Sequence, residues 1–414
     1  MDVELVTVGT ELLLGFTVDP NSAEIGRALA AAGVRVARRT AVHDDVGAIR
    51  DAVSAALRRT GAVITTGGLG PTADDITKSA VAALFGVRMR FDEAVWAALE
   101  RRFQRLGRVP SANNRCQADV PEGAVVLPNR WGTAPGLWLE GQPGLVVMLP
   151  GVPVEMRNLL EHEVVPRLAG RGAGGVIRSV TVRTTGIAES TLAERLGDID
   201  ERLAPLTLAY LPGRGSVDLR ATAWNLAAEE ADRRLTEAAR LLRERAGDHA
   251  YGLGDTDLAE VVLQLLRKRG WRIAVAESCT GGLLGGRITA IPGSSSQFLG
   301  GVIAYSDAVK TAQLGVPADL LAQHGAVSEA VAAAMASGVR TALGADVGVG
   351  ITGIAGPEGG TPDKPVGTVC FGLVLPGKTE GLRRGVVGNR EEIRERSTQV
   401  ALFELWKRLE LLPE

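Results

Sequence analysis

Apolar residues follow two alternating periods along the first 110 residues of the chain. Short continuous apolar runs indicate buried strands, whereas apolar residues that recur every three or four positions indicate helices. These patterns predict strands at residues 3–8, 34–38 and 62–66, and helices at residues 22–32, 46–57, 74–85 and 93–106. Ser22 is the expected N-cap of the first helix. The alternation predicts a mostly parallel sheet covered by helices, so ligands are expected in the loops after Val8 and Thr66.

A glycine-rich joint, RLAGRGAGG at residues 167–175, separates this region from a shorter pattern. The pattern has the order β-α-β-β-α, with strands at residues 176–184, 206–211 and 216–223 and helices at residues 189–203 and 227–246. It contains no recognisable catalytic group of residues. We therefore expect a spacer or a dimerisation unit here.

A third region begins near Gly254. It predicts strands at residues 272–277, 298–305, 346–352, 366–375 and 382–387, and helices at residues 258–270, 328–343 and 391–409. The chain of 414 residues is long enough for two or three domains at about 150 residues each. The expected fold class is α/β: two α/β sandwich domains with mostly parallel sheets, residues 1–169 and 252–414, joined by a small α+β domain, residues 170–251.

Composition narrows the possible functions. The chain has 46 basic and 48 acidic residues, a net charge of −2, which disfavours general binding to nucleic acid. Its three cysteines form no CxxC pair, so neither a disulfide framework nor a zinc ribbon is expected. The N-terminus has no basic region, and no apolar run approaches a membrane span, so a cytoplasmic location without membrane contact is expected. The 52 glycines exceed the roughly 29 that average usage would give, which suits anion-binding loops.

The segment AESCTGG, residues 276–282, lies where a predicted strand meets the start of a helix. A serine at such an elbow can project from the sheet edge beside backbone N–H groups, the geometry of a nucleophile next to an oxyanion site. Ser278 is the candidate nucleophile, and Thr280 and Ser295 are alternatives. A plain helix cap by Ser278 or Thr280 would also explain the pattern. Cys279 is more simply interpreted as a small packing residue.

A base and an anion-binding loop follow in the same region. Lys310 ends the segment YSDAVK at a predicted sheet edge, and a partly desolvated lysine can act as a base for serine. All four histidines lie outside the glycine-rich loops. The loop TGIAGPEGGTPDKPVG, residues 352–367, could hold a phosphate, with Arg390 and Arg394 adding positive charge. No GxxxxGK[ST] pattern is present, so ATP hydrolysis is not indicated.

Five motifs of this region, AESCTGG, PGSSSQF, YSDAVK, GAVSEAV and GIAGPEGGTPDKPVGTV, together resemble the nicotinamide-nucleotide amidase (NMN deamidase) domain family. The resemblance implies hydrolysis of the carboxamide of nicotinamide mononucleotide, without a cofactor, in pyridine-nucleotide salvage. It implies that Ser278, Tyr305 and Lys310 are catalytic, with Tyr305 assisting Lys310. The substrate-binding residues that it implies are Cys279, Thr280, Gly281, Ser295, Thr352, Gly353, Ala355, Gly356 and Arg394. Asp307 stands where many members have Asn and is not expected to contact the substrate.

The segment TTGGLGPTADD, residues 65–75, follows a predicted strand in the first region. Its glycines allow close approach to a phosphate, and its acidic residues offer oxygen ligands to a divalent cation, although a glycine turn with an acidic cap would look alike. Together with GTELLLG, HDD, PNRWGTAPG and LPGVPVEM, it resembles the molybdopterin-binding (MoaB/MogA-like) domain in the branch found in competence/damage-inducible CinA proteins.

This second resemblance implies metal-dependent hydrolysis of ADP-ribose at its pyrophosphate. The residues expected to bind the nucleotide are Gly67, Gly68, Gly70, Thr72 and Thr133. The residues expected to bind a divalent metal are Asp44, Asp74 and Asp75, with Glu11 nearby.

Three hypotheses for the whole chain follow from the sequence. The first is a bifunctional hydrolase of pyridine-nucleotide recycling, acting on two small nucleotides and forming a homodimer through its middle region. The second is an accessory protein of competence or DNA damage. The third is a pterin-binding scaffold whose first domain has no catalytic activity.

Overall fold

The computed structural model describes residues 1–169, 171 and 175–412. They form two compact units, which are described separately: Met1–Arg178 together with Thr222–Arg234, and Ser179–Ala221 together with the chain from Leu235 on. The predicted glycine-rich joint at 167–175 lies partly outside the described residues. The division into three domains stays a prediction.

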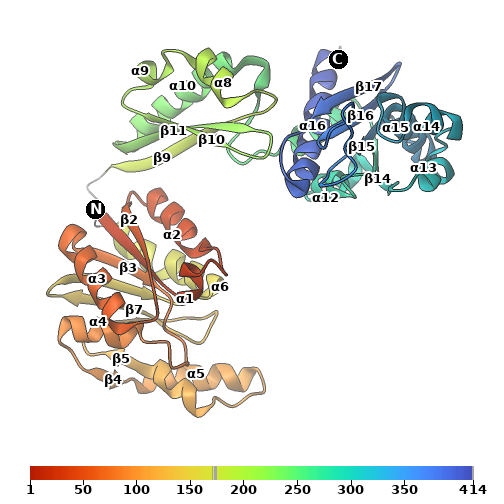
Figure 1. Ribbon diagram of the computed structural model, residues 1–414. Helices are drawn as coiled ribbons and strands as arrows, with labels where there is room; N and C mark the ends of the chain where they lie inside the picture. Colours follow the sequence, from red (N-terminus) through yellow and green to blue (C-terminus); the bar gives the residue numbers. More distant parts are fainter. Residues whose placement is uncertain (170, 172–174, 413–414) are drawn as a thin grey trace. The chain divides into compact units, whose positions relative to one another are not determined.

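The first unit is built on a six-stranded sheet with the order β2-β1-β3-β8-β7-β6 (Figure 1). Its strands are β1 (Asp2–Val8), β2 (Arg35–Val42), β3 (Ala62–Thr66), β6 (Val125–Leu127), β7 (Gly136–Gly141) and β8 (Gly144–Leu149). The four strands from β2 to β8 pair in parallel, and β7 and β6 continue the sheet antiparallel. A separate pair is formed by β4 (Met89–Phe91) and β5 (Asp119–Pro121).

Helices cover both faces of this sheet because its strands are apolar on both sides. Side chains alternate along a strand: in β1, Val3 and Leu5 face one layer, and Val6 and Val8 face the other. The first layer contains α2 (Pro20–Ala31), α6 (Pro153–Leu159), the π-turn Leu160–Val164 and α7 (Val165–Ala169). The second contains α3 (Val46–Thr60) and α4 (Thr77–Phe85). The remaining helices are α1 (Thr10–Leu13), α5 (Glu93–Arg105) and the 3-10 helix η1 (Ala112–Ala118).

Two helix starts differ from the prediction. Asp19, not Ser22, caps α2: its carboxylate accepts the backbone N–H of Ser22 at 3.0 Å, and Pro20 occupies the first helical position. Proline suits that position because its missing N–H is not needed there. The next difference is α4, which begins at Thr77 rather than at residue 74. Asp75 is instead held in the preceding loop by the N–H groups of Gly70 and Thr72.

The middle region contains one helix break and one strand that the sequence did not predict. Its elements are β9 (Val176–Thr184), α8 (Glu189–Leu196), α9 (Ile199–Leu203), β10 (Thr207–Pro212), β11 (Val217–Leu226), α10 (Ala228–Ala246), the 3-10 helix η3 (Gly247–His249) and β12 (Ala250–Leu253). Gly197, at φ +54°, separates α8 from α9. The additional strand β12 pairs antiparallel with β9 in a sheet of order β10-β11-β9-β12.

The sheet of the last region has the order β14-β13-β15-β16-β17. Its strands are β13 (Ile273–Glu277), β14 (Phe298–Ile303), β15 (Val347–Gly353), β16 (Thr368–Leu375) and β17 (Lys378–Gly385). The first three in the sheet run parallel, and β16 and β17 run antiparallel.

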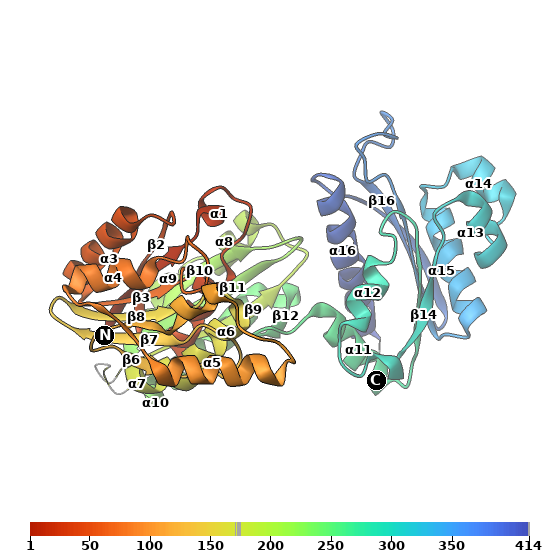
Figure 2. The same cartoon turned by 90° about the horizontal axis from the view of Figure 1, so that it is seen from below.

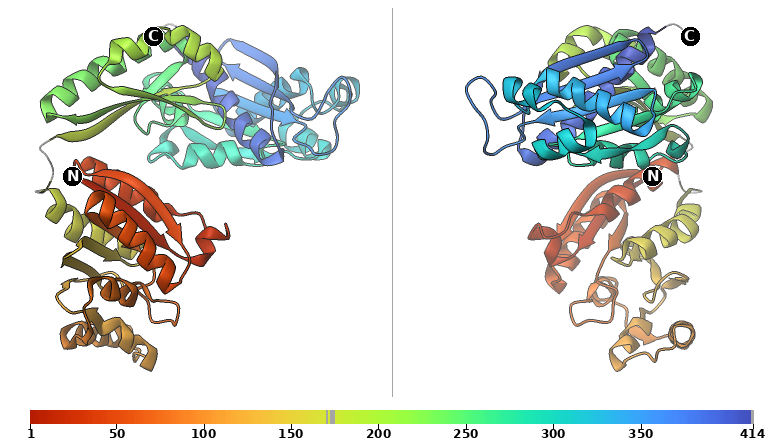
Figure 3. Two further views of the ribbon diagram at one scale, coloured as in Figure 1. Left: turned by 60° about the vertical axis from the view of Figure 1, so that its left-hand side comes forward. Right: turned by 90° about the vertical axis from the view of Figure 1, so that its right-hand side faces the viewer.

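Helices cover this sheet on both faces as well (Figures 2 and 3). One layer contains α11 (Leu258–Lys268), α12 (Leu283–Thr289) and α16 (Arg390–Leu411). The other contains α13 (Asp307–Leu314), α14 (Ala318–His324) and α15 (Glu329–Leu343). The 3-10 helix η4 (Ser294–Ser296) precedes β14.

The α/β class predicted from the sequence is confirmed. In both large sheets the parallel strands adjoin one another, and antiparallel strands extend one edge. Among the residues described, no helix has the length and apolar character that crossing a membrane requires.

Candidate active site

Three neighbouring parallel strands of the last region end at one edge of the sheet. Glu277, the last residue of β13, pairs with Ile303 of β14 on one side and with Ile351 of β15 on the other. The backbone continues this register, because the N–H of Ser278 donates to the carbonyl of Ile351 at 2.9 Å. Ser278, Tyr305 and Thr352 therefore lie close together, although up to 74 positions separate them in the sequence.

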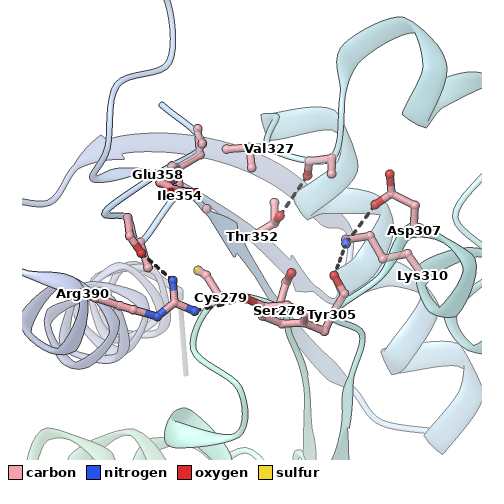
Figure 4. Close-up of a pocket in the computed structure, with 15 residues that line it drawn as sticks. Ser278, Cys279, Tyr305, Asp307, Lys310, Val327, Thr352, Ile354, Glu358 and Arg390 are labelled. Carbon is pink, nitrogen blue, oxygen red and sulfur yellow. Dashed lines mark hydrogen bonds and ion pairs between the residues drawn. The ribbon is translucent and has the colours of Figure 1, made fainter. Parts of the chain in front are cut away.

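A pocket of about 280 Å³ lies at this edge (Figure 4). This volume approaches the lower limit of about 300 Å³ for small-molecule sites, which suits a compact ligand. Its lining residues are Ser278, Cys279, Tyr305, Asp307, Lys310, Ala326, Val327, Thr352, Gly353, Ile354, Ala355, Gly356, Glu358, Gly359 and Arg390.

The turn that presents Ser278 is fixed by a buried carboxylate. Glu277 is only 2% exposed, and its oxygens accept three backbone N–H groups, from Gly282 at 3.0 Å, Leu284 at 3.1 Å and Gly285 at 2.8 Å. These are the first donors of α12, which would otherwise lack partners at a helix start. Glu277 thus accepts the hydrogen bonds of the N–H groups at the start of α12 and fixes the conformation of the Ser278 turn.

Few backbone amides of this turn remain for an oxyanion. The N–H of Gly281 donates to the carbonyl of Ser278 at 3.1 Å. Within the described part of the chain, the N–H groups of Cys279 and Thr280 donate to no oxygen. Arg394 braces the same turn from α16, donating to the carbonyls of Cys279 and Thr280 at 3.1 Å each. The two amides after Ser278 are therefore the candidate oxyanion donors.

Lys310 is the buried cation of the pocket. Its side chain is 2% exposed, and its Nζ donates to the carbonyl of Tyr305 at 3.3 Å and to Asp307 Oδ1 at 3.1 Å. Over the residues that the structure describes, no hydrogen bond joins Lys310 to Ser278, although both line the pocket. Asp307, which was not expected to contact the substrate, lines the pocket and pairs with Lys310. Its lack of substrate contact stays a prediction.

Tyr305 contacts Lys310 through its backbone rather than through its ring. Its hydroxyl instead accepts a hydrogen bond from Arg390 Nη2 at 3.2 Å, and the side chain is 62% exposed. Arg390 also donates through Nη1 to the carbonyl of Gly356 at 2.6 Å. The predicted assistance of Tyr305 to Lys310 is therefore not seen, and Tyr305 belongs to the arginine side of the pocket.

The predicted binding residues divide into two groups. Those that line the pocket are Cys279, Thr352, Gly353, Ala355 and Gly356; those that do not are Thr280, Gly281, Ser295 and Arg394. Thr280 is completely buried, and Ser295 is exposed on η4 outside the pocket. Of the two arginines expected to add positive charge, Arg390 lines the pocket, and Arg394, one turn later on α16, does not. Three further lining residues, Ile354, Glu358 and Gly359, belong to the loop predicted to hold a phosphate, whereas Ala326 and Val327 were not assigned to the site.

The thiol of Cys279 is poorly suited to nucleophilic attack. Burial raises its pKa to about 12, and the nearby Glu277 carboxylate acts in the same direction. At pH 8 only about one molecule in 10⁴ would then carry the thiolate, against about a quarter for an ordinary cysteine.

We therefore expect iodoacetamide at pH 8 to label the exposed Cys116 and to spare Cys279 and Cys370. Burial also raises the pKa of Cys370, to about 11. Peptide mass spectrometry of the native protein measures the labelling, and the urea-unfolded protein, labelled at all three cysteines, is the control. Rapid labelling of Cys279 in the native protein would contradict this assignment.

The glycine-rich loop of the first unit lies at the carboxyl ends of β3 and β8. The N–H of Gly67 donates to the carbonyl of Leu149 at 3.0 Å. Gly67 has φ +103°, and a Cβ there would lie 2.2 Å from the carbonyl oxygen of Val8, so only glycine fits. Asp75 accepts the N–H groups of Gly70 at 2.7 Å and Thr72 at 2.8 Å, together with the Thr72 hydroxyl.

The predicted metal ligands are not gathered. Asp44 accepts the N–H and hydroxyl of Thr10 at 2.8 and 2.9 Å, Asp74 is exposed, and Asp75 is engaged by its own loop. Across residues 1–169, 171 and 175–412, no group of three His, Cys, Asp or Glu side chains is placed to hold a metal ion. The acidic residues therefore do not fit a metal site built from three protein ligands. Thr133 lines a second pocket, which contains no residue of the glycine-rich loop.

Three family models match consecutive parts of the chain. Residues 4–170 match "Probable molybdopterin binding domain", residues 179–252 match "Damage-inducible protein CinA KH domain", and residues 255–409 match "CinA C-terminal domain".

Relatives match over almost the whole length. A CinA-like protein from Gemmatimonas aurantiaca is 55% identical, covering 98% of this chain and 96% of its own. Another from Frankia casuarinae is 44% identical, covering 100% of this chain and 97% of its own. A crystal structure of a competence-damaged protein (CinA) superfamily member from Klebsiella pneumoniae is 37% identical, with a TM-score of 0.36; it covers 38% of this chain and 100% of its own.

Proposed function

The chain belongs to the CinA family, and from this premise we propose that its C-terminal pocket hydrolyses the carboxamide of nicotinamide mononucleotide. The products are nicotinate mononucleotide and ammonia. One observation carries the proposal: a serine, a buried lysine and two backbone amides that donate to no oxygen lie at one sheet edge. An amide hydrolase needs a nucleophile, a proton acceptor and donors for the oxyanion.

The charges of the pocket suit this substrate. Nicotinamide mononucleotide carries a positive pyridinium ring and a negative phosphate. The pocket presents Arg390 on one side and the carboxylates of Asp307 and Glu358 on others. A lining of mixed sign favours a zwitterion over a simple anion, because each charge of the ligand meets an opposite one.

The proposed reaction proceeds through an ester. Ser278 Oγ attacks the carboxamide carbon while Lys310 Nζ, acting in its neutral amine form, takes the hydroxyl proton and becomes the ammonium that Asp307 faces. The amides of Cys279 and Thr280 hold the oxyanion. Lys310 then gives this proton to the departing nitrogen, which leaves as ammonia. Water cleaves the ester and returns a proton to Ser278. The substrate complex must bring Nζ within reach of Ser278, as catalytic hydrogen bonds often tighten only on substrate binding.

The proposal is tested by product analysis with the purified full-length chain. We expect one ammonia and one nicotinate mononucleotide per molecule of nicotinamide mononucleotide consumed. Nicotinamide riboside, which lacks the phosphate, should react more slowly through a higher KM. No ammonia from the mononucleotide at any pH between 6 and 9 would refute the proposal.

Arg390 is expected to bind the substrate phosphate. Arg390→Gln should raise KM for nicotinamide mononucleotide at least about tenfold, since charge-assisted hydrogen bonds to phosphate contribute about 1.5–3 kcal/mol. The value of kcat should change little, and riboside turnover should be unaffected. Steady-state kinetics measure both parameters, with Lys268→Gln, which removes an exposed cation outside the pocket, as the control. An equal loss for both substrates would contradict the phosphate contact.

For the first unit we propose nucleotide binding at the loop of residues 67–75, with ADP-ribose as the expected substrate. Its support is the family relationship and the glycine positions at the strand ends. No step through a metal is derived, because the acidic residues form no three-ligand group in the described chain. Incubation with ADP-ribose and Mg²⁺ or Mn²⁺ should release AMP and ribose 5-phosphate. If no divalent metal ion gave either product, the hydrolysis would be refuted and only nucleotide binding would remain.

A direct role at nucleic acid has weaker support. The β9 to α10 order matches that of a KH domain, which clamps nucleotides with a GXXG loop between two helices. Here the α8–α9 connection consists of Gly197 and Asp198, and Asp198 accepts a hydrogen bond from Arg245 at 2.9 Å. An acidic residue at this position opposes a phosphate backbone.

A further inference from the structure

A second pocket lies in the first unit, between α5 and the segment that leads into β7. It encloses about 570 Å³, well within the range of about 300–1,000 Å³ that small-molecule sites occupy. One wall is formed by residues of α5 between positions 94 and 105, and the other by residues between positions 126 and 135. Of all residues assigned above to a nucleotide or metal, only Thr133 lines it.

The lining carries an excess of positive charge. The single acidic lining residue is Asp92. Four arginines line the pocket: Arg101, Arg102, Arg105 and Arg130. The Asp92 carboxylate is already used, since it caps α5 through the N–H groups of residues 94 and 95 and pairs with Arg90. In the described part of the protein, Arg101, Arg105 and Arg130 form no ion pair. A bound anion would therefore supply the negative charge that these three arginines lack within the protein.

The walls of this pocket are already held in place. Arg102 donates to the carbonyl of Arg130 at 3.0 Å and to that of Trp131 at 2.6 Å, which ties the opposite wall to α5. Asn129 stiffens that wall, because its Oδ1 accepts the N–H groups of Trp131 at 2.9 Å and Gly132 at 2.8 Å. Because these walls are already ordered, ligand binding would cost little conformational entropy of the protein, which favours affinity.

The floor is apolar. Val95 and Leu99 are buried, and together with Val126, Pro128 and Pro135 they give the lining an uncharged part. A ligand that fits both parts has an anionic end and a flat or apolar body. Guanidinium groups bind phosphate in a bidentate manner and stack on aromatic rings.

We propose that this pocket binds a nucleoside phosphate, with Arg101 and Arg105 on the phosphate and the apolar floor under the nucleoside. The site is independent of the proposed amidase reaction. None of its lining residues belongs to the glycine-rich loop of residues 67–75. The two are linked through neighbours: Gln117 donates to Thr133 at 3.2 Å, and the Sγ of the preceding residue, Cys116, lies 3.9 Å from the carbonyl of Gly70.

The test is isothermal titration of the full-length chain with ADP and with adenosine. We expect the double variant Arg101→Gln/Arg105→Gln to weaken ADP binding at least about tenfold, and adenosine to bind far more weakly than ADP. Arg108→Gln, an exposed arginine outside the pocket, is the matched control and should bind as the wild type does. Far-UV circular dichroism checks that α5 is intact.

Ala98→Trp provides a second test, because its side chain would fill the pocket without changing the charge. It should also weaken ADP binding at least about tenfold. Wild-type affinity in both variants would overturn the proposal. So would ADP binding that the Arg101/Arg105 variant retains and Asp75→Asn loses, since that would place the nucleotide at the glycine-rich loop.

Discussion

Lys310→Met should lower kcat for ammonia release from nicotinamide mononucleotide by about 10²–10⁴-fold, the usual contribution of a positioned proton-transfer group. Methionine nearly preserves the volume of the lysine stem, so the packing around this buried position should survive. Among the described residues that line the pocket, Lys310 and Arg390 have basic side chains, and an arginine does not give up its proton. The change therefore removes the group that could accept the Ser278 proton. KM should stay within about threefold, because Lys310 is not expected to bind the phosphate.

Two controls make this result specific. Lys268→Met removes an exposed lysine outside the pocket and should leave both parameters unchanged. Asp307→Asn retains an oxygen that can accept from Lys310 Nζ and should retain most of kcat, whereas the loss of its negative charge should raise KM. If Lys310→Met turned over at more than a tenth of the wild-type rate while folded, another group would be the base.

Glu277→Ala should lower the free energy of unfolding of the last region by about 2–4 kcal/mol, because one buried and two half-buried N–H groups lose their acceptor at once. The buried N–H of Leu284 would be left in the protein interior without a partner, which costs more than the hydrogen bond itself contributes. The Ser278 turn depends on the same contacts, so activity should fall with stability.

Urea unfolding followed by tryptophan fluorescence measures this loss, with the exposed Glu410→Ala as the control for removing a glutamate. Glu277→Gln should fall between the wild type and Glu277→Ala, since its amide keeps one accepting oxygen but not the second. Equal stability of the wild type and Glu277→Ala would show that the carboxylate does not hold the turn.

Local sequence patterns predicted the elements that place the pocket. The strand ending at Glu277, the glycine-rich turn after Ser278 and the strand before Thr352 all have strong local signals, and adjacency of their ends follows from parallel pairing. The strands β6 to β8 were not predicted. The strand β6 has only three residues, and β7 and β8 meet at a hairpin of glycine and proline at Gly141–Gly144. Both features hide the alternation of apolar residues that marks a strand.

The side chains of the pocket were harder to predict than its backbone. Arg390 and Arg394 both stand in the first turns of α16, and only the rotation of that helix against the sheet decides which one reaches the pocket. The ion pair between Asp307 and Lys310 was not predicted, because it depends on Lys310 turning back toward Asp307 by one helical turn. A fully buried carboxylate such as Glu277 is rare, so its position before a glycine turn gave no warning.

The most direct measurement of the central claim is the rate of ammonia release from nicotinamide mononucleotide by the full-length protein and by Ser278→Ala in one assay. The account predicts turnover by the wild type and at least about a 10³-fold loss in kcat for the variant, as for other nucleophilic serines. Ser295→Ala, the exposed alternative, should retain wild-type activity. Undiminished release by Ser278→Ala, or activity lost only in Ser295→Ala, would contradict the account.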